Sequence, residues 1–253
     1  MTLLPDNERA PMPADAYSLP LFIEESQPFA LDPLGEALEP YEQAAARGEI
    51  PAMLYLGRFY ANGRDGDVSP DFEQARQWFA KAAALGDAYA LNGLGTLYHR
   101  GGFGIERDLH QARRFYQKAA GAGSLQALCN LGLICEEEGY DEQALQWFDR
   151  AARKGFGGAR QHSQRLLHRI ARRYHDGSPD PDYRQARRWY EKAAAIGSVT
   201  SMYNLGLLYE KGGFGLDPDH STAIRWYEKA AAAGDPDAPN SLARLRPNPG
   251  HRS

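Results

Sequence analysis

Residues 202–234 read MYNLGLLYEKGGFGLDPDHSTAIRWYEKAAAAG and hold two apolar patterns on either side of a glycine-rich segment. The first pattern runs from Met202 to Tyr209 and the second from Ala223 to Ala231. In both, apolar or small residues recur at i, i+3, i+4 and i+7, which is typical of a helix buried along one side. The stretch therefore predicts two antiparallel helices joined by a turn.

The same unit occurs five times along the chain, with a Leu-Gly pair in its first helix and an Ala-Ala pair in its second. The first-helix pairs are Leu56-Gly57, Leu94-Gly95, Leu131-Gly132 and Leu205-Gly206, with Ile170-Ala171 in the fourth repeat. The second-helix pairs are Ala82-Ala83, Ala119-Ala120, Ala151-Ala152, Ala193-Ala194 and Ala230-Ala231. A spacing of about 37 residues is typical of a helical solenoid. We place the repeats at about 49–86, 87–123, 124–157, 158–197 and 198–235.

Large rings and small residues recur at fixed positions of the repeat. All four tryptophans take one position, which Phe115 fills in the second repeat: Trp78, Trp147, Trp189 and Trp226. We expect these rings to wedge one hairpin against the next. The glycine of the Leu-Gly pair costs about 1 kcal/mol in a helix interior. Close approach of two helix backbones is the best explanation for it.

The ends of the helices also follow the repeat. We expect the second helices to begin after an aspartate that caps them, and to end at a glycine in the left-handed conformation. The aspartates are Asp71, Asp108, Asp182 and Asp219, and the glycines are Gly86, Gly123, Gly197 and Gly234. The residue after each glycine is a good cap for the next first helix, namely Asp87, Ser124, Ser198 and Asp235.

With these features the chain resembles the Sel-one-like repeats, close relatives of the tetratricopeptide repeats. The pattern Leu-Gly-x-x-Tyr, Gly-x-Gly, Asp-x-x-x-Ala-x-x-Trp-Tyr-x-Lys-Ala-Ala-x-x-Gly covers about residues 49–235. The third repeat lacks the Gly-x-Gly turn, and the fourth lacks the Leu-Gly glycine. The resemblance implies an all-α, right-handed solenoid of antiparallel helix pairs. It also implies an adaptor that assembles other proteins, and it does not imply an enzyme.

The two ends of the chain differ from the repeats. Residues 1–33 are rich in proline and show no helical period, which predicts an extended or disordered arm. Residues 34–48 resemble a second helix without its first, so we expect an N-terminal capping helix there. Residues 236–253 predict a C-terminal capping helix followed by a tail.

Composition suggests where the protein works. The chain has 253 residues, of which 43% are hydrophobic, but no apolar run approaches a membrane span. The N-terminus shows no basic patch followed by an apolar core, so we expect no signal peptide and a cytoplasmic protein. Cys129 and Cys135 lie six apart on one predicted helix, on different faces, and should not pair. Arginine far outnumbers lysine, which suggests a bacterial source.

The residues give little support for catalysis. The chain has no Ser-x-x-Lys, Gly-x-Ser-x-Gly, phosphate-loop or Cys-x-x-Cys motif. His168 and His175 share a helix face, but no carboxylate or cysteine completes a metal set. We therefore expect no enzyme activity, no metal and no cofactor. A hydrolase of the β-lactam-binding type and a nucleic-acid-binding protein are the distant alternatives; clustered arginine suits phosphates, but the chain carries a net charge of −4.

In tetratricopeptide-like solenoids the first helices line a concave groove, and this resemblance assigns the groove residues here. They are Tyr89, Asn92, Thr96, His99, Arg100, Gln126, Leu133, Glu136, Glu137, Arg165, His168, Arg172, His175, Tyr203, Leu207 and Glu210. Eleven basic and three acidic residues in segment 150–190 make the middle of this groove basic, although a solvated helix face explains the charge equally well. Such a groove suits an extended acidic peptide.

The sequence thus predicts a protein-protein interaction adaptor or scaffold that holds a protein or an acidic peptide, in a bacterial signalling or regulatory complex. The alternative is a self-inhibited regulator. Residues 1–50 contain ten acids and two bases, so the arm at residues 1–30 would occupy the basic groove of its own or a neighbouring chain until a partner displaces it. Two charged segments that never meet are equally compatible with the sequence.

Overall fold

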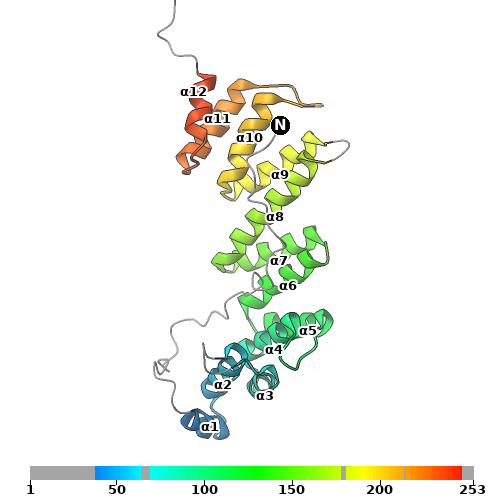
Figure 1. Ribbon diagram of the computed structural model, residues 1–253, viewed down its shortest axis with the longest axis vertical. Coiled ribbons are helices and arrows are strands. Elements are labelled where there is room, and N and C mark those ends of the chain that lie inside the picture. Colours follow the sequence, from blue (N-terminus) through cyan, green and yellow to red (C-terminus); the bar gives the residue numbers. More distant parts are fainter. Residues whose placement is uncertain (1–37, 64–68, 178–180, 214, 247–253) are drawn as a thin grey trace, which may run out of the picture. The chain divides into compact units, whose positions relative to one another are not determined.

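The computed structural model describes residues 38–63, 69–177, 181–213 and 215–246. Within these ranges every regular element is an α-helix, so the predicted all-α class is confirmed (Figure 1). The helices are α1 (Glu39–Ala46), α2 (Ile50–Asn62), α3 (Phe72–Ala84), α4 (Ala88–Arg100), α5 (Leu109–Gly121), α6 (Leu125–Glu137), α7 (Asp141–Arg153), α8 (Gly157–His175), α9 (Tyr183–Ala195), α10 (Val199–Lys211), α11 (His220–Ala232) and α12 (Ala238–Leu245).

The chain divides into two compact units, Met1–Leu131 and Gly132–Ser253, and the division falls inside α6. In the first unit α2 packs against α3, α4 packs against α5, and α3 also contacts α4. In the second unit α8 packs against α9, α10 packs against α11, and α9 contacts α10. Each unit is therefore a stack of helix pairs, the arrangement of a helical solenoid. We call α2, α4, α6, α8 and α10 the first helices and their partners the second helices.

The Leu-Gly glycines lie where the two helices of a pair approach most closely, as the sequence predicts. A Cβ added at Gly57 would lie 2.7 Å from the ring of Phe79, and one at Gly206 would lie 2.5 Å from the ring of Tyr227. Gly132 faces Phe148 in the same way. A side chain at these positions would collide with an aromatic ring. Glycine is required there because it has no Cβ.

The rings that fill these contacts are not the tryptophans. The residue after each tryptophan is fully buried, namely Phe79, Phe148, Tyr190 and Tyr227, with Tyr116 in the second repeat. The tryptophans themselves are only half-buried, at the edge of the apolar stripe. Tyr190 and Trp189 both lie three or four residues from the buried Ala186 and Ala193, so the packing against the partner helix, where Tyr190 is fully buried, selects the inner ring.

The outer side of each half-buried ring is covered by a cation three residues further along the helix. The Nζ of Lys81 lies 3.7 Å from the centroid of the Trp78 ring, and that of Lys192 lies 3.8 Å from the Trp189 ring. A cation at this distance is attracted to the face of the ring. The ring predicted as a core wedge therefore lies at the boundary of the core, with one side against apolar residues and the other under a solvated cation.

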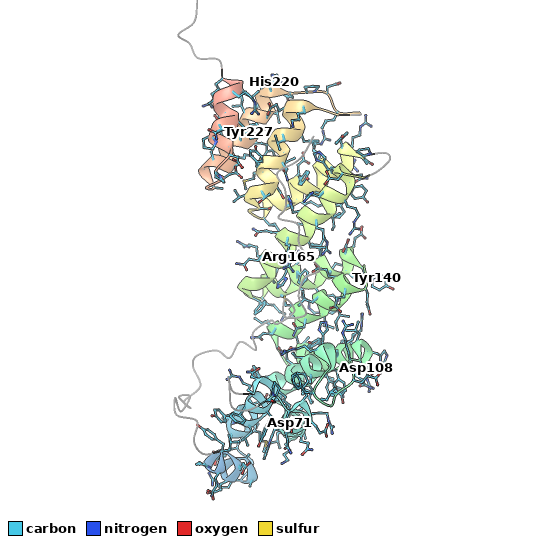
Figure 2. All side chains as sticks on the ribbon, in the orientation of Figure 1. Asp71, Asp108, Tyr140, Arg165, His220 and Tyr227 are labelled. Carbon is cyan, nitrogen blue, oxygen red and sulfur yellow. The ribbon has the colours of Figure 1, made fainter. Side chains whose placement is uncertain are left out.

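Side-chain caps begin the second helices as predicted. Asp71 and Asp108 are labelled in Figure 2. Their Oδ1 atoms each accept a hydrogen bond of 2.9 Å from the backbone nitrogen three residues on. Asp182 and Asp219 do the same at 2.9 and 3.0 Å. Ser198 differs from the prediction, because its hydroxyl donates to Ser201 instead of capping α10.

Two glycine-rich turns connect first and second helices, and each docks on the preceding repeat. The turns close through the bridges Gly102↔Ile105 and Gly213↔Leu216. The ring of Phe103 lies 5.1 Å from that of Phe72 in α3, and Gly213 contacts Tyr183 in α9. The third repeat lacks this turn, and Gly139 at a φ of 82° leads directly into α7.

Helices also occur in both predicted capping segments. Near the N-terminus α1 packs against α2, and near the C-terminus α12 packs against α11. The predicted arm at residues 1–33 and the final residues 247–253 lie outside the described residues.

Candidate protein-binding surface

The predicted groove residues belong to the first helices, and we describe them unit by unit as the first-helix surface. The first unit holds Tyr89, Asn92, Thr96, His99, Arg100 and Gln126. The second unit holds Leu133, Glu136, Glu137, Arg165, His168, Arg172, His175, Tyr203, Leu207 and Glu210. The structure separates these residues into buried, internally paired and accessible side chains.

Four of the predicted groove residues are buried in the protein and are not open to solvent: Asn92, His99, Leu133 and Tyr203. The Oδ1 of Asn92 accepts a 3.0 Å hydrogen bond from Nδ2 of Asn130. Tyr203 lies 3.5 Å from the Ser241 hydroxyl in α12. Asn92 and Tyr203 lie two residues before the Leu of a Leu-Gly pair and face the second helix along the chain, α6 or α12. The offsets taken from tetratricopeptide-like solenoids do not distinguish this packed side of the helix from its open side.

Two predicted acids hold the second unit together. Both oxygens of Glu210 accept hydrogen bonds of 2.8 Å from Arg244 in α12, and one accepts a 2.7 Å bond from the Tyr227 hydroxyl. Burial alone would raise the pKa of Glu210, but these bonds hold it below its usual value. Glu136 accepts a 2.7 Å bond from Arg169 in α8. Both carboxylates are engaged inside the protein.

The remaining predicted residues are at least partly accessible. Arg100 and Arg165 are exposed, and the half-buried ones are Tyr89, Thr96, Gln126, Glu137, His168, Arg172, His175 and Leu207. Figure 2 shows Arg165 on α8. In the first unit the guanidinium of Arg100 lies over the Phe72 ring at 5.6 Å. The accessible part of the first-helix surface is thus polar and cationic, with one leucine.

Part of the basic segment 150–190 is paired with acidic residues. Five of its eleven cations form ion pairs inside the second unit: Arg153, Arg169, Arg172, Arg173 and Arg187. Arg169 and Arg173 both contact Asp141 at the start of α7, at 3.2 and 3.0 Å. These two pairs join the third and fourth repeats where the glycine turn is lacking. The positive charge left for a ligand is smaller than the sequence suggests.

Two histidines of α8 lie in apolar surroundings. The ring of His162 stacks on Phe148 at a centroid distance of 5.2 Å, and burial with help from Arg165 lowers its pKa to about 4. His175 lies edge-on to Tyr183 and Tyr190, and burial lowers its pKa. Both rings are therefore neutral at pH 7 and act as packing groups.

Arg58 in α2 was not among the predicted groove residues, because the groove offsets were applied only from the second repeat onward. It follows Leu56 by two residues, the same offset that separates Thr96 from Leu94. The exposure of two aromatic side chains, Tyr140 and Tyr174, was also not predicted from the sequence. Nothing in the apolar period distinguishes them from buried rings.

The repeat architecture agrees with known proteins. The family model of the Sel1 repeat matches residues 50–87, 88–124, 125–156, 166–198 and 199–235. The chain belongs to the Sel1 repeat family. Proteins with Sel1 repeats are generally protein-protein interaction scaffolds, and their fold is typically non-catalytic.

Several crystal structures of Sel1 repeat proteins are similar to this chain. A Sel1 repeat protein from Oxalobacter formigenes is 32% identical over 78% of this chain and 79% of its own, with a TM-score of 0.44. The protective antigen c5321 of uropathogenic Escherichia coli is 25% identical over 81% and 58%, with a TM-score of 0.34. A sel1 repeat protein from Klebsiella pneumoniae subsp. pneumoniae is 23% identical over 83% and 99%, with a TM-score of 0.38. The comparison with curated proteins found no match.

Two features of the described residues concern metal binding and membranes. Among them, no group of three or more His, Cys, Asp or Glu side chains is arranged to hold a metal ion. None of the helices that the structure describes is both long and apolar enough to cross a membrane.

Proposed function

We propose that this Sel1 repeat protein is a non-catalytic scaffold that binds a segment of another protein on its first-helix surface. The observation that carries the proposal is the row of accessible side chains on successive first helices of the second unit. Arg165 on α8 and Thr200 and Lys211 on α10 are exposed, and Leu207 is half-buried. Cationic and apolar groups on adjacent parallel helices suit an extended peptide that carries both carboxylates and apolar side chains.

The setting we propose is a bacterial signalling or regulatory complex in the cytoplasm. The excess of arginine over lysine supports a bacterial source. A self-inhibited form, in which residues 1–30 occupy the surface, has opposite charge in its favour, but those residues lie outside the described ranges. The internal pairing of five cations in segment 150–190 weakens that attraction.

Affinity capture with matched variants tests the proposal. Arg165→Glu/Lys211→Glu reverses two exposed cations on first helices, and Arg188→Glu/Arg225→Glu reverses two exposed cations on second helices, so the two variants have the same net charge. We expect the first variant to lose partner proteins that the wild type and the second variant retain. Equal capture by all three proteins, with unchanged thermal unfolding, would contradict binding at the first-helix surface.

A further inference from the structure

Arg58 in α2 is a half-buried cation without a carboxylate partner among the described residues. Its Nε is shielded from solvent and forms no hydrogen bond there. Buried polar groups are almost always hydrogen-bonded, and a guanidinium without an acceptor is costly. The side chain projects from the first helix of the first repeat, at the offset that places Thr96 on the accessible surface of the second.

Tyr89 on the neighbouring first helix also has a buried donor without an acceptor among the described residues. Its hydroxyl is buried and forms no hydrogen bond with the described residues, while its ring packs against the core of the first unit. Burial raises the pKa of Tyr89 to about 12, and the positive charge of Arg58 opposes this rise. Because α2 and α4 are in contact, the two unsatisfied donors lie within electrostatic range of each other.

The two first helices that carry these donors contain no acidic side chain. The helices α2 and α4, IPAMLYLGRFYAN and AYALNGLGTLYHR, contain arginine and histidine but no aspartate or glutamate. The carboxylate of Asp87 acts electrostatically on Tyr89, and it caps α4 through a 2.7 Å bond from the Ala90 nitrogen. The local charge is therefore positive on this pair of first helices.

We infer that Arg58, assisted by Tyr89, is a subsite for a carboxylate of the protein segment that binds the first unit. The inference rests on the proposed function and adds a place and a chemical group to it. A carboxylate accepts charge-assisted hydrogen bonds from a guanidinium through two oxygens, and its remaining lone pairs accept a phenolic hydroxyl. The carboxylate comes either from an acidic side chain or from the C-terminus of the partner.

The test is an NMR titration of the full chain that follows the Nε–H resonance of Arg58. Three blocked tetrapeptides serve as probes at millimolar concentration: one with two glutamates and an amidated end, its glutamine twin, and one of alanines with a free C-terminal carboxylate. We expect saturable movement of the Arg58 resonance with a carboxylate peptide and none with the glutamine peptide. The responding peptide identifies the source of the carboxylate.

Variants separate the subsite from a general charge effect. Arg58→Met keeps the apolar stem and should weaken binding of the responding peptide more than tenfold. Tyr89→Phe should weaken it by about tenfold, as expected for one hydrogen bond to a charged group. Arg114→Met removes an exposed cation from α5 of the same unit and should leave binding unchanged.

Several results would overturn the subsite. These are a stationary Arg58 resonance with every peptide, equal movement with the glutamine peptide, or wild-type affinity in Arg58→Met. Shifts confined to other first-helix residues, such as Thr96 and Gln126, would overturn the subsite and leave the proposed surface standing. Shifts confined to α3 and α5 would contradict both.

Discussion

Gly95 of α4 and Tyr116 of α5 are packed so closely that a Cβ added to the glycine would lie 2.5 Å from Cδ1 of the tyrosine ring. The ring is fully buried, and the helices of this pair have no room to separate without losing the rest of their contact. The same relationship joins Gly206 to Tyr227. The glycine and the ring thus specify the distance between the two helices of a repeat.

Gly95→Ala should therefore destabilise the protein, although alanine is the better helix former by about 1 kcal/mol. We expect a loss of roughly 1 to 3 kcal/mol in the free energy of unfolding, the usual cost of overpacking. Gly121→Ala in α5 is the matched control, because a Cβ there meets nothing within 4 Å. Urea unfolding should show the control to be neutral or more stable. A stabilised Gly95→Ala would mean that the close approach is not rigid.

The two adjacent rings of α9 should differ in their contribution. Tyr190 is fully buried, whereas Trp189 is half-buried with Lys192 over its outer face. Tyr190→Ala should cost about 3 to 5 kcal/mol, the range for deletion of a buried aromatic ring. Trp189→Ala should cost clearly less. If urea unfolding shows a larger loss of stability for Trp189→Ala than for Tyr190→Ala, the tryptophan is the ring that fills the core.

Stability should fall in mild acid because of His162. Its pKa is lowered from 6.5 to about 4 in the folded protein, so between these values the unfolded chain binds more protons and gains population as the pH falls. We expect the unfolding equilibrium constant to rise by roughly tenfold to a hundredfold from this group. His175 adds to the same slope, because burial lowers its pKa too.

Thermal and urea unfolding at several pH values between 4 and 7 measure this slope. The variant His162→Phe keeps a ring stacked on Phe148 and should show a shallower pH dependence. His220→Phe replaces an exposed histidine of α11 and should keep the wild-type dependence. Identical slopes in all three proteins would show that His162 titrates normally.

The junction of the third and fourth repeats should be sensitive to salt. Asp141 has a side chain that is only 12% exposed and receives both Arg169 and Arg173. Asp141→Asn should lower stability by about 1 to 3 kcal/mol at low salt, because two cations lose a well-placed acceptor. The difference should shrink at high salt.

The control for this junction is Asp149→Asn on the same helix. Asp149 is 56% exposed and pairs with Arg153, which is 79% exposed, and such surface pairs contribute little. We therefore expect a near-neutral change in urea unfolding at either salt concentration. Equal effects of the two substitutions would mean that the Asp141 pairs are ordinary surface pairs.

Most of the fold could be predicted because its determinants are local and repeated. The Leu-Gly and Ala-Ala pairs, the capping aspartates and the terminal glycines each recur at a fixed position, so each copy supports the others. The identity of the buried ring could not be assigned so simply, because Trp189 and Tyr190 are adjacent and both are large and apolar. Only the packing of α9 against its neighbouring helices places Tyr190 inward.

The candidate surface could be predicted less well for two reasons. Asn92 and Tyr203 are buried against Asn130 of α6 and Ser241 of α12. The apolar periodicity of a single helix does not reveal partners on another helix. Part of the charge of segment 150–190 is similarly offset by acids distant in sequence, as Arg169 shows with Glu136 and Arg173 with Asp141. Sequence composition counts charges, but it does not pair them.

The central claim is that partners bind on the first helices, and site-specific photo-crosslinking measures this directly. A photoreactive amino acid in place of Thr200 on α10 sits on the first-helix surface, and one in place of Ala195 on α9 sits on a second helix; both positions are exposed. The account predicts that the protein substituted at Thr200 crosslinks to its partner and the protein substituted at Ala195 does not. Crosslinking from Ala195 alone, with the fold of both proteins intact, would contradict it.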